Sequence, residues 1–273
     1  MKSNRMSYIG LGCLFSTLFF SITAFTQQAK VEQKKPKEIT YELLRPIEFA
    51  DGTQKKSVTK TEIQTLRDQS ILLWEGIQDE GVELRKSKEE KIRVHTCKEY
   101  DDALEQGYFP YSNAAIMDAA WLKYPCGTLK LLDQATPPER SFLPPAEELF
   151  DLKLLPLMLF PIMTDFEQEY GYNIENDTYQ DRVDRGFMEV TKPTGKPNPF
   201  KAAYTDEGLE QNLTQVVRAD FNGDGIEDIL LYEAVYAVGA SFRSYDVIIL
   251  TRKSVDGKFV VIFQDGSTDI DHP

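Results

Sequence analysis

The sequence predicts an α+β protein in which a helical N-terminal and middle region is followed by a four-stranded antiparallel meander. Between residues 58 and 135, apolar residues recur at spacings of three and four, which is the period of a helix. After residue 200, apolar residues follow a strand pattern and are separated by Asn-Gly and Asp-Gly turn signals, as in hairpins. A nine-residue loop rich in side-chain oxygens, residues 220–228, falls between the first two predicted strands. With 273 residues, the chain is long enough for one large or two small domains.

The first residues have the pattern of a targeting segment. Lys2 and Arg5 form a positively charged start, and residues 7–25 contain no charge and many Leu, Phe and Ile residues. A charged start followed by an apolar run is typical of a secretory signal peptide. We therefore predict that residues 1–26 are a signal peptide and that the mature protein is periplasmic or secreted.

The exact processing of this segment is open. Cleavage is expected before Gln27, and cleavage after Ala24 is nearly as good. A retained segment would instead be a membrane anchor, because about nineteen apolar residues can just span a bilayer. Lipid modification of Cys13 is the third alternative, and it is disfavoured because most of the apolar run follows this cysteine.

The net charge limits the kinds of molecule that this protein is expected to bind. The formal charge is −13, and the mature chain is more acidic still because the signal peptide carries two positive charges. Nucleic-acid binding needs a basic surface, so we expect no nucleic-acid partner. A divalent cation or a basic partner fits the sign of the charge.

The N-terminal third is predicted to contain one hairpin and one helix. Residues 27–38 are polar and rich in Lys and Gln, which predicts a flexible tether. Residues 39–49 alternate and are followed by an Asp-Gly turn at 51–52, which predicts a short strand or hairpin. Residues 58–76 have apolar positions at helical spacing and predict a helix. The charge-dense stretch 79–91 predicts a solvated connection.

The middle of the chain carries the clearest helix signals. Residues 96–99, Thr-Cys-Lys-Glu, have the spacing of a capping box, and Gly107 is placed to end the helix that follows. Ser112 opens a second helix, which Pro125 is expected to stop. Residues 128–135 predict a further turn or two of helix.

Two stretches connect this region to the predicted sheet. Residues 144–163 are the most apolar part of the mature chain and are broken by prolines, so they predict short pieces of buried core. The Pro/Gly-rich stretch 191–199 predicts a boundary. It divides a mostly helical region, 39–190, from an antiparallel β region, 200–265. The four strands of that region are predicted at 215–218, 228–238, 244–252 and 258–264.

The cysteines predict one disulfide. Cys13 belongs to the signal peptide, which leaves Cys97 and Cys126 as an even pair in an exported chain. In the chain-entropy model, closing this loop of about thirty residues stabilises the fold by roughly 3 to 4 kcal/mol. A zinc site would need His95 as a third ligand and lacks a clear fourth. A nucleophilic pair of His95 with Cys97 is possible only if the fold brings their side chains together.

The loop at 220–228 predicts a calcium site. Oxygen-bearing side chains stand at positions one, three, five and nine, glycine stands at six, and a backbone carbonyl is available at seven. These are the oxygen ligands that a cation of calcium's size takes. The metal ligands are therefore predicted to be Asp220, Asn222, Asp224, Asp228 and the carbonyl of Ile226. A bare Asn-Gly-Asp-Gly turn is the alternative, but it would leave three neighbouring carboxylates to repel one another.

The flanks of the loop decide its type. An EF-hand has Glu at position twelve and flanking helices, whereas this chain has Leu231 there and strand-forming residues on both sides. The run Asp-Phe-Asn-Gly-Asp-Gly-Ile-Glu-Asp-Ile-Leu-Leu resembles the calcium-binding strand-loop-strand of FG-GAP (integrin-type) and VCBS repeats. The resemblance covers about a dozen residues in a single copy, and it implies a local calcium site with the same five ligands.

Catalytic motifs are not evident in the sequence. Gly-x-Ser-x-Gly, His-Glu-x-x-His and a phosphate-binding glycine loop are all missing, and there are only two histidines, of which His272 lies in a polar tail. Glu167 and Glu169, beside Tyr170 and Tyr172, are a carboxylate pair that is equally well explained as a solvated edge.

These observations favour a non-catalytic function. The first hypothesis is a secreted or periplasmic calcium-binding protein of the cell envelope that binds an unknown envelope or extracellular ligand. The second is a calcium-stabilised envelope hydrolase with its site in the helical half. The third is a membrane-anchored interaction subunit, which requires that the signal segment is retained.

Overall fold

The computed structural model describes residues 38–145, 151–161, 176–191, 199–204 and 208–264. Several sequence predictions fall outside these ranges. They are the signal peptide 1–26, the tether up to Lys37, most of the predicted boundary 191–199, the carboxylate pair Glu167 and Glu169 with their neighbouring tyrosines, and His272.

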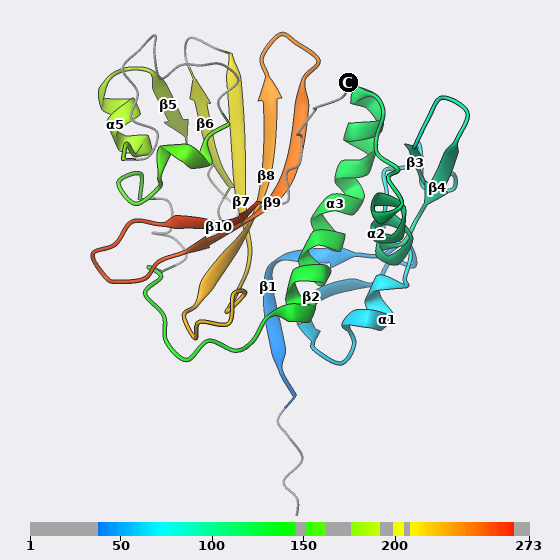
Figure 1. Cartoon of the computed structure of the whole chain (residues 1–273), viewed down its shortest axis with the longest axis horizontal. Coiled ribbons are helices and arrows are strands. Elements are labelled where there is room, and N and C mark those ends of the chain that lie inside the picture. The colour runs from blue at the N-terminus through cyan, green and yellow to red at the C-terminus, as the bar shows by residue number, and fades with distance from the viewer. Residues whose placement is uncertain (1–37, 146–150, 162–175, 192–198, 205–207, 265–273) are drawn as a thin grey trace, which may run out of the picture. The chain divides into compact units, whose positions relative to one another are not determined.

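An antiparallel sheet of eight strands organises the described part of the chain (Figure 1). Its central path runs β10-β9-β8-β7-β1-β2, while β6 also pairs with β7 and β5 pairs with β6. The strands are β1 Thr40–Glu48, β2 Gln54–Thr59, β5 Met188–Thr191, β6 Pro199–Tyr204, β7 Leu209–Ala219, β8 Asp228–Ala237, β9 Arg243–Thr251 and β10 Val260–Gln264. The eleven-residue β7 is central because it pairs with β8 on one side and with β6 and then β1 on the other.

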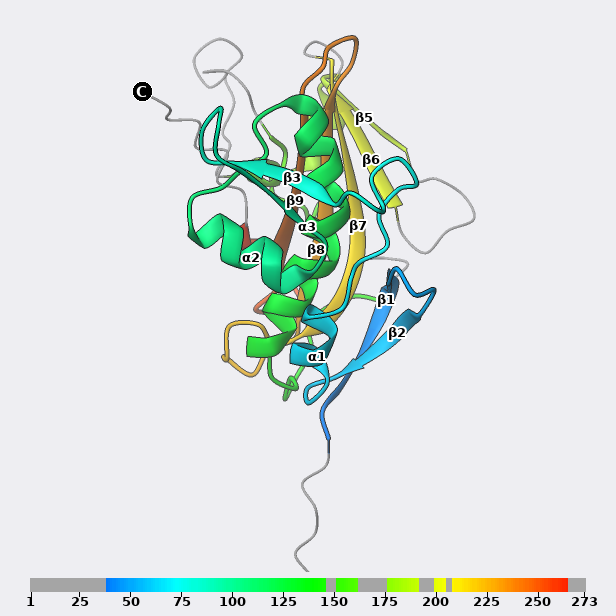
Figure 2. The same ribbon diagram turned by 90° about the vertical axis from the view of Figure 1, so that its right-hand side faces the viewer.

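Helices and a small hairpin cover one face of this sheet (Figure 2). The longest helix, α3, lies against the sheet, and α2 and the β3–β4 hairpin lie on its far side (Figures 1 and 2). The bounds of these elements are α1 Ile63–Arg67, β3 Val82–Arg85, β4 Lys91–Val94, α2 Cys97–Glu105 and α3 Asn113–Gln134. The 3-10 turn η2 Leu157–Leu159 and helix α5 Tyr179–Asp184 pack with a second group of core residues.

Strand β8 shows that the sheet is covered on both faces. Its first eight residues are all buried. Leu230 and Tyr232 pack into the cluster that contains α3, whereas Ile229 and Leu231 pack into the cluster that contains η2 and α5. Because neighbouring side chains of a strand point to opposite faces, a strand with two buried faces has a nearly continuous apolar sequence.

The predicted fold class is wrong, because the described part of the chain is mostly β. It contains ten strands and four α-helices, and the C-terminal sheet has more than the four predicted strands. The region 39–190, predicted to be mostly helical, contributes β1, β2 and β5 to the same sheet. Strands β8, β9 and β10 agree with the predicted strands, and β7 begins six residues earlier than predicted.

The helix predicted at 58–76 is mostly absent. Val58 and Thr59 end β2, and only Ile63–Arg67 is helical, with Ile63 and Leu66 buried. After this single turn the backbone forms bridges from Ser70 to Thr96 and from Ile71 to Phe49. The apolar spacing is therefore produced by one helical turn followed by an extended segment.

The stretch 79–91 was predicted to be a solvated connection, but it includes β3 and the start of β4. Val82 and Leu84 are buried on one face of this hairpin. On its outer face, the carboxylate of Glu83 makes ion pairs of 2.6 Å with Arg85 and 3.0 Å with Lys91. The density of charge hid the strand alternation in the sequence.

Helix α3 continues through Pro125, which was predicted to stop it. Residues 124–129 are all buried, so packing outweighs the backbone hydrogen bond that proline removes. Gly127 lies so close to the sheet that a Cβ atom there would be 2.9 Å from a methyl group of Val247. The predicted helix at 128–135 is therefore the last part of α3. The predicted start of α2 is confirmed, since Thr96 and Glu99 form a capping box.

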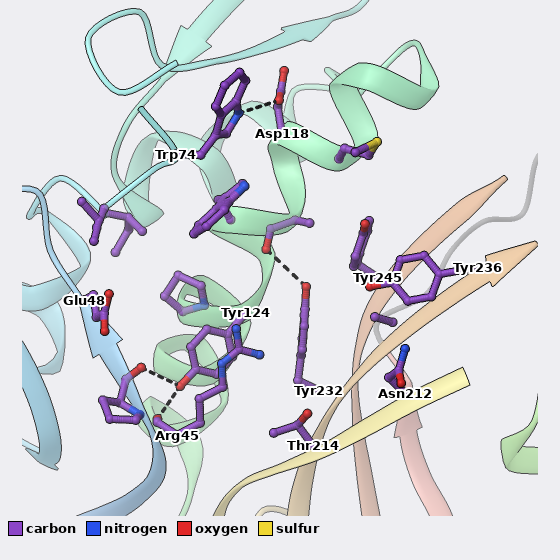
Figure 3. A pocket seen from close by; sticks show the side chains of 18 residues that line it. Arg45, Glu48, Trp74, Asp118, Tyr124, Asn212, Thr214, Tyr232, Tyr236 and Tyr245 are labelled. Atoms are coloured by element: carbon purple, nitrogen blue, oxygen red, sulfur yellow. Dashed lines mark hydrogen bonds between the residues drawn. The ribbon is translucent and has the colours of Figure 1, made fainter. Parts of the chain in front are cut away.

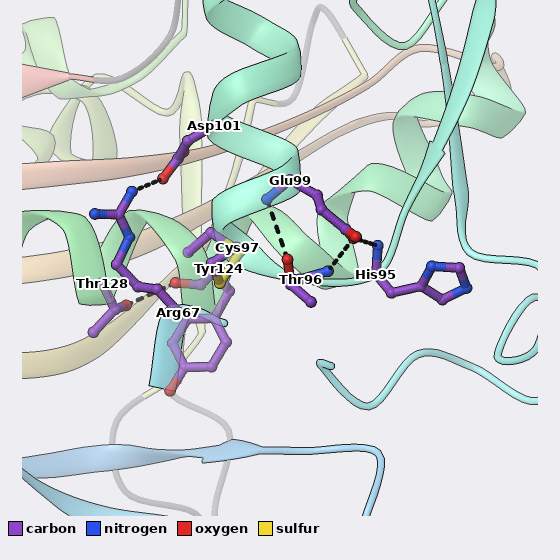
Figure 4. The surroundings of a disulfide bond; sticks show 9 residues. Arg67, His95, Thr96, Cys97, Glu99, Asp101, Tyr124 and Thr128 are labelled. Carbon is purple, nitrogen blue, oxygen red and sulfur yellow. Dashed lines mark hydrogen bonds and ion pairs between the residues drawn. A yellow bond between two sulfur atoms is a disulfide. The ribbon is translucent and has the colours of Figure 1, made fainter. Parts of the chain in front are cut away.

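A disulfide joins α2 to the middle of α3 (Figure 4). Cys97 and Cys126 are both fully buried, and their Cα atoms are 4.8 Å apart. The side chain of His95 points away from the disulfide (Figure 4), and its backbone N–H donates to Glu99. A reactive pair of Cys97 with His95 is therefore not formed.

Replacing both disulfide cysteines with serine is expected to lower the free energy of unfolding by about 3 to 4 kcal/mol, because the unfolded chain regains the entropy of an open loop. Urea denaturation of the double variant and of the oxidised wild type measures this loss. The reduced wild type is the matched control and should unfold with the double variant. Equal midpoints for oxidised protein and double variant would contradict the expectation.

Glu233 is a buried acidic side chain on the face of the sheet beneath η2. Glu233 is 2% exposed and accepts a hydrogen bond from the amide of Gln211, which also binds the carbonyl of Leu159 and accepts from Tyr179. Burial raises the pKa of Glu233 to about 7, with the Gln211 bond opposing the rise and the charge of the cross-strand neighbour Asp246 adding to it.

The variant Glu233→Gln is expected to be more stable than the wild type at pH 8. The folded-state pKa lies above the ordinary value of 4.5, so the wild type loses stability as the pH rises from about 4.5 through about 7. The amide variant has no such loss and should gain roughly 1–3 kcal/mol at pH 8. Thermal melts at pH 5 and pH 8 test this, with Glu105→Gln on the exposed end of α2 as the control. A stability gap that does not widen with pH would refute it.

Candidate functional site

The predicted calcium loop connects β7 to β8. The last pair of these strands is Ala219 with Asp228. The nine-residue loop therefore consists of the eight residues between them and of Asp228, which is also the first residue of β8. Gly223 and Gly225 have φ angles of +79° and +76°, which side chains other than glycine rarely adopt. Asp220 and Asp228, at the two ends of the loop, are 3% and 0% exposed. The fold thus places two of the predicted ligands in the interior and Asn222 and Asp224 on the surface.

The loop is shaped by its own side chains. The carboxylate of Asp220 accepts hydrogen bonds from the N–H groups of Gly223 and Gly225, at 2.7 and 2.9 Å. Asn222 accepts from the N–H of Asp224 at 2.9 Å, and Asp224 accepts from the N–H of Ile226 at 2.8 Å. These side-chain turns fold residues 220–226 into a compact bend.

The residues that follow α3 clasp this loop. We call residues 136–141 the clasp segment. Thr136 and Asp220 exchange two backbone hydrogen bonds of 2.8 and 3.0 Å. The carbonyl of Gly225 accepts from two N–H groups of the clasp segment, and the N–H of Glu227 donates to the carbonyl of Arg140. The bridge between Arg140 and Ile226 uses the carbonyl of Gly225 and the N–H of Glu227. Successive peptide groups of an extended chain point to opposite sides, so the carbonyl of Ile226 faces away from the clasp segment.

Asp228 has a buried oxygen without a partner. Its Oδ2 accepts from the N–H of Phe221 at 3.0 Å, but its Oδ1 has no hydrogen bond among the described residues. Burial raises the pKa of Asp228, and the charges of Asp224 and Asp220 raise it further. The Thr251 hydroxyl opposes this rise, although it lies outside hydrogen-bonding geometry. Since a buried unpaired carboxylate oxygen is costly, a bound cation would stabilise it.

Asp220 behaves differently from Asp228. Burial acts to raise its pKa, but the N–H groups of Gly225 and Gly223 and the hydroxyl of Thr136 outweigh burial and lower it. Asp220 is therefore held as a carboxylate.

The donor set fits a hard cation, although its carboxylates are not assembled around one point. Among the described residues, no three His, Cys, Asp or Glu side chains are grouped as a metal site. Asp220 and Asp224 direct oxygens to backbone N–H groups instead. The other two predicted ligands, the Asn222 amide and the Ile226 carbonyl, are of further oxygen types that Ca²⁺ accepts.

A second feature, which the sequence did not predict, is an aromatic cavity of about 830 Å³ (Figure 3). It lies between α3 and the sheet. We use the name aromatic cavity for the space lined by the aromatic residues Trp74, Trp121, Tyr124, Tyr232, Tyr236 and Tyr245. Its polar lining residues are Arg45, Glu48, Asp118, Asn212 and Thr214.

The periodicities of the elements explain this lining. Positions 232, 234 and 236 of β8 alternate onto one face of the sheet, and Tyr245 is paired with Ala234 on the same face. Positions 117, 118, 121 and 124 of α3 share the facing side of the helix. Met117 and Trp121 on this side of α3 are 50% and 46% exposed. The one signal that the sequence offered is the helical spacing of these large side chains, since their exposure is seen only in the folded chain.

Hydrogen bonds fix several groups of the aromatic cavity. The indole N–H of Trp74 donates to Asp118 at 3.0 Å. The hydroxyl of Tyr124 donates to the backbone carbonyls of Arg45 and Pro46. Burial raises the pKa of Tyr124, and it raises the pKa of Tyr245 to about 12. Tyr124 and Tyr245 are therefore neutral at physiological pH.

Comparison with protein-family models, with curated proteins and with solved structures found no match for this chain. The resemblance of the loop to FG-GAP and VCBS repeats thus stays a prediction from a dozen residues. None of the described helices is long and apolar enough to cross a membrane. Function is therefore argued from the loop and the aromatic cavity.

Proposed function

We propose that this chain is an exported, non-catalytic calcium-binding protein of the cell envelope, in which one Ca²⁺ stabilises a ligand-binding fold. The observation that carries the proposal is the Oδ1 atom of Asp228, which is buried and has no partner among the described residues. It lies at the end of a loop whose oxygen-bearing residues have the spacing of a calcium site.

The residues that would hold the ion are Asp220, Asn222, Asp224, Asp228 and the carbonyl of Ile226. Bound Ca²⁺ would neutralise three neighbouring carboxylates and provide a partner for the orphan oxygen. The electrostatics of the loop support this role, because the charges of Asp224 and Asp220 help to raise the pKa of the buried Asp228, and a bound cation would offset them.

The contacts of the loop indicate what the ion would stabilise. The clasp segment joins the loop to the end of α3 by five backbone hydrogen bonds. Helix α3 and strand β8, which begin or end at this junction, form two walls of the aromatic cavity. An ion in the loop would therefore hold together the elements that shape the cavity, without itself contacting a ligand there.

A calcium-stabilised hydrolase is the second candidate. It is favoured by one observation, which is that the carboxylates of Glu48 and Asp118 both line the aromatic cavity. Glu48 accepts a hydrogen bond from Gln54 and Asp118 accepts one from Trp74, as expected of binding groups that are held in place. Loss of an activity on substitution of either carboxylate would favour this candidate over the first.

Calcium is expected to raise the melting temperature of the purified protein. At a free Ca²⁺ concentration about one hundred times Kd, one bound ion adds about 2.7 kcal/mol to the stability. Thermal melts in excess calcium and in chelator measure the shift. Asp224→Ala should abolish it, while Asp256→Ala, in the turn between β9 and β10, is the matched control and should retain it. Equal melting temperatures in calcium and in chelator would refute the proposed function.

A further inference from the structure

The aromatic cavity has the size and composition of a binding site for an organic ligand. Its volume of about 830 Å³ lies within the range of small-molecule sites, which is roughly 300–1,000 Å³. Such sites combine apolar walls with a few polar groups that fix orientation. The polar groups of this cavity therefore indicate the chemistry of the ligand.

Within the part of the chain that the structure describes, Arg45 is the only cationic residue that lines the cavity. Its guanidinium lies over two aromatic rings, 4.1 Å from the centroid of Tyr124 and 4.9 Å from that of Tyr232 (Figure 3). No hydrogen bond or ion pair within the described residues uses this guanidinium. A planar group that packs against two neighbouring rings keeps N–H donors at its edge, where they fit a carboxylate in a bidentate manner.

The backbone of β1 explains why Arg45 reaches the cavity. The register between β1 and β2 shifts between Glu42 and Ile47, so Arg45 lies in an irregular stretch of the strand. A bulge of this kind redirects side chains that a regular strand would place elsewhere. The Tyr124 hydroxyl, which donates to the carbonyls of Arg45 and Pro46, holds the irregular stretch against α3.

The cavity also offers acceptors for hydroxyl groups. Within the described residues, Glu48 and Asp118 each accept one side-chain hydrogen bond, and an ionised carboxylate has further lone pairs available. The side chains of Asn212 and Thr214 add an amide and a hydroxyl from β7. A ligand with several hydroxyl groups would satisfy these atoms, whereas a lipid chain would leave them desolvated. A ligand with many negative charges is disfavoured because two carboxylates line the same space.

Two half-exposed indoles complete the site. Trp74 and Trp121 are 45% and 46% exposed, and the bond from Trp74 to Asp118 fixes the first ring to α3. Flat aromatic faces of this kind suit the apolar face of a sugar ring, since they bury area at a small cost in side-chain entropy.

We propose that the aromatic cavity binds an acidic saccharide, with the sugar carboxylate on Arg45, hydroxyl groups on Glu48 and Asp118, and ring faces on Trp74 and Trp121. This inference names the ligand class of the proposed binding protein and rests on that function. It uses none of the calcium ligands, so the two proposals fail separately.

The test is an array of oligosaccharides containing uronic, sialic or muramic acid, each printed beside its own methyl ester. The full mature chain in calcium is expected to bind at least one acid, and to bind its ester at least about tenfold more weakly because the ester has lost the charge. Benzoate in solution is the competitor that distinguishes an acidic sugar from an aromatic acid, and it should not displace the sugar.

Two variants assign the binding to the cavity. Arg45→Gln should weaken binding of the acid about tenfold or more and leave binding of the ester unchanged. Trp121→Ala removes a half-exposed ring and should weaken both, and circular dichroism checks that each variant is folded. Arg243→Gln is the matched control, because Arg243 also lies over a tyrosine ring, at 5.0 Å from Tyr236, but does not line the cavity.

Each outcome separates the proposals. The saccharide inference is overturned if no acid binds, if acids and esters bind equally, or if folded Arg45→Gln binds as the wild type does. Displacement by benzoate would assign the cavity to aromatic acids instead. Asp224→Ala, assayed in parallel, should lose calcium stabilisation while its ligand binding at low temperature persists, so a failed calcium response leaves the saccharide test valid.

Discussion

The junction of β7 and β8 is the constraint on which the rest of the structure depends. β7 pairs with three strands, and its last residues form the pairing with the start of β8 and the pairing of Val217 with Leu43 of β1. At this junction the chain turns through a loop with three aspartates, of which Asp228 is fully buried with one oxygen unpaired among the described residues. A buried carboxylate with an unpaired oxygen at the end of these two strands is the physical reason for our proposal that a cation binds here.

The clasp segment connects this junction to the aromatic cavity. It follows α3 directly and pairs with both ends of the loop, so hydrogen bonds link the loop to the helix that forms one wall of the cavity. The disulfide fixes the same helix to α2 from the opposite side. Helix α3 is thus held at its end by hydrogen bonds and at its middle by a covalent bond, which positions Trp121 and Tyr124 relative to the sheet.

Local signals in the sequence predicted the local structures, and interactions between distant segments account for the rest. The capping box at Thr96 and the strands after the loop depend on neighbouring residues and agree with the structure. The pairing of Leu43 with Val217 joins segments far apart in the chain, which periodicity cannot predict. At Pro125 the burial of the surrounding residues overrides a rule that holds for isolated helices. The aromatic cavity was missed for the same reason, because Arg45, Trp121 and Tyr232 come from three elements that meet only in the folded chain.

Titration calorimetry of Ca²⁺ into the folded, demetallated protein tests the central claim most directly. The account predicts binding of one ion per chain, with the heat lost in Asp228→Asn, which keeps the shape of the side chain but removes its charge. A titration that records no heat up to about 1 mM Ca²⁺ would contradict it, because about 1 mM is the highest Kd known for extracellular calcium modules.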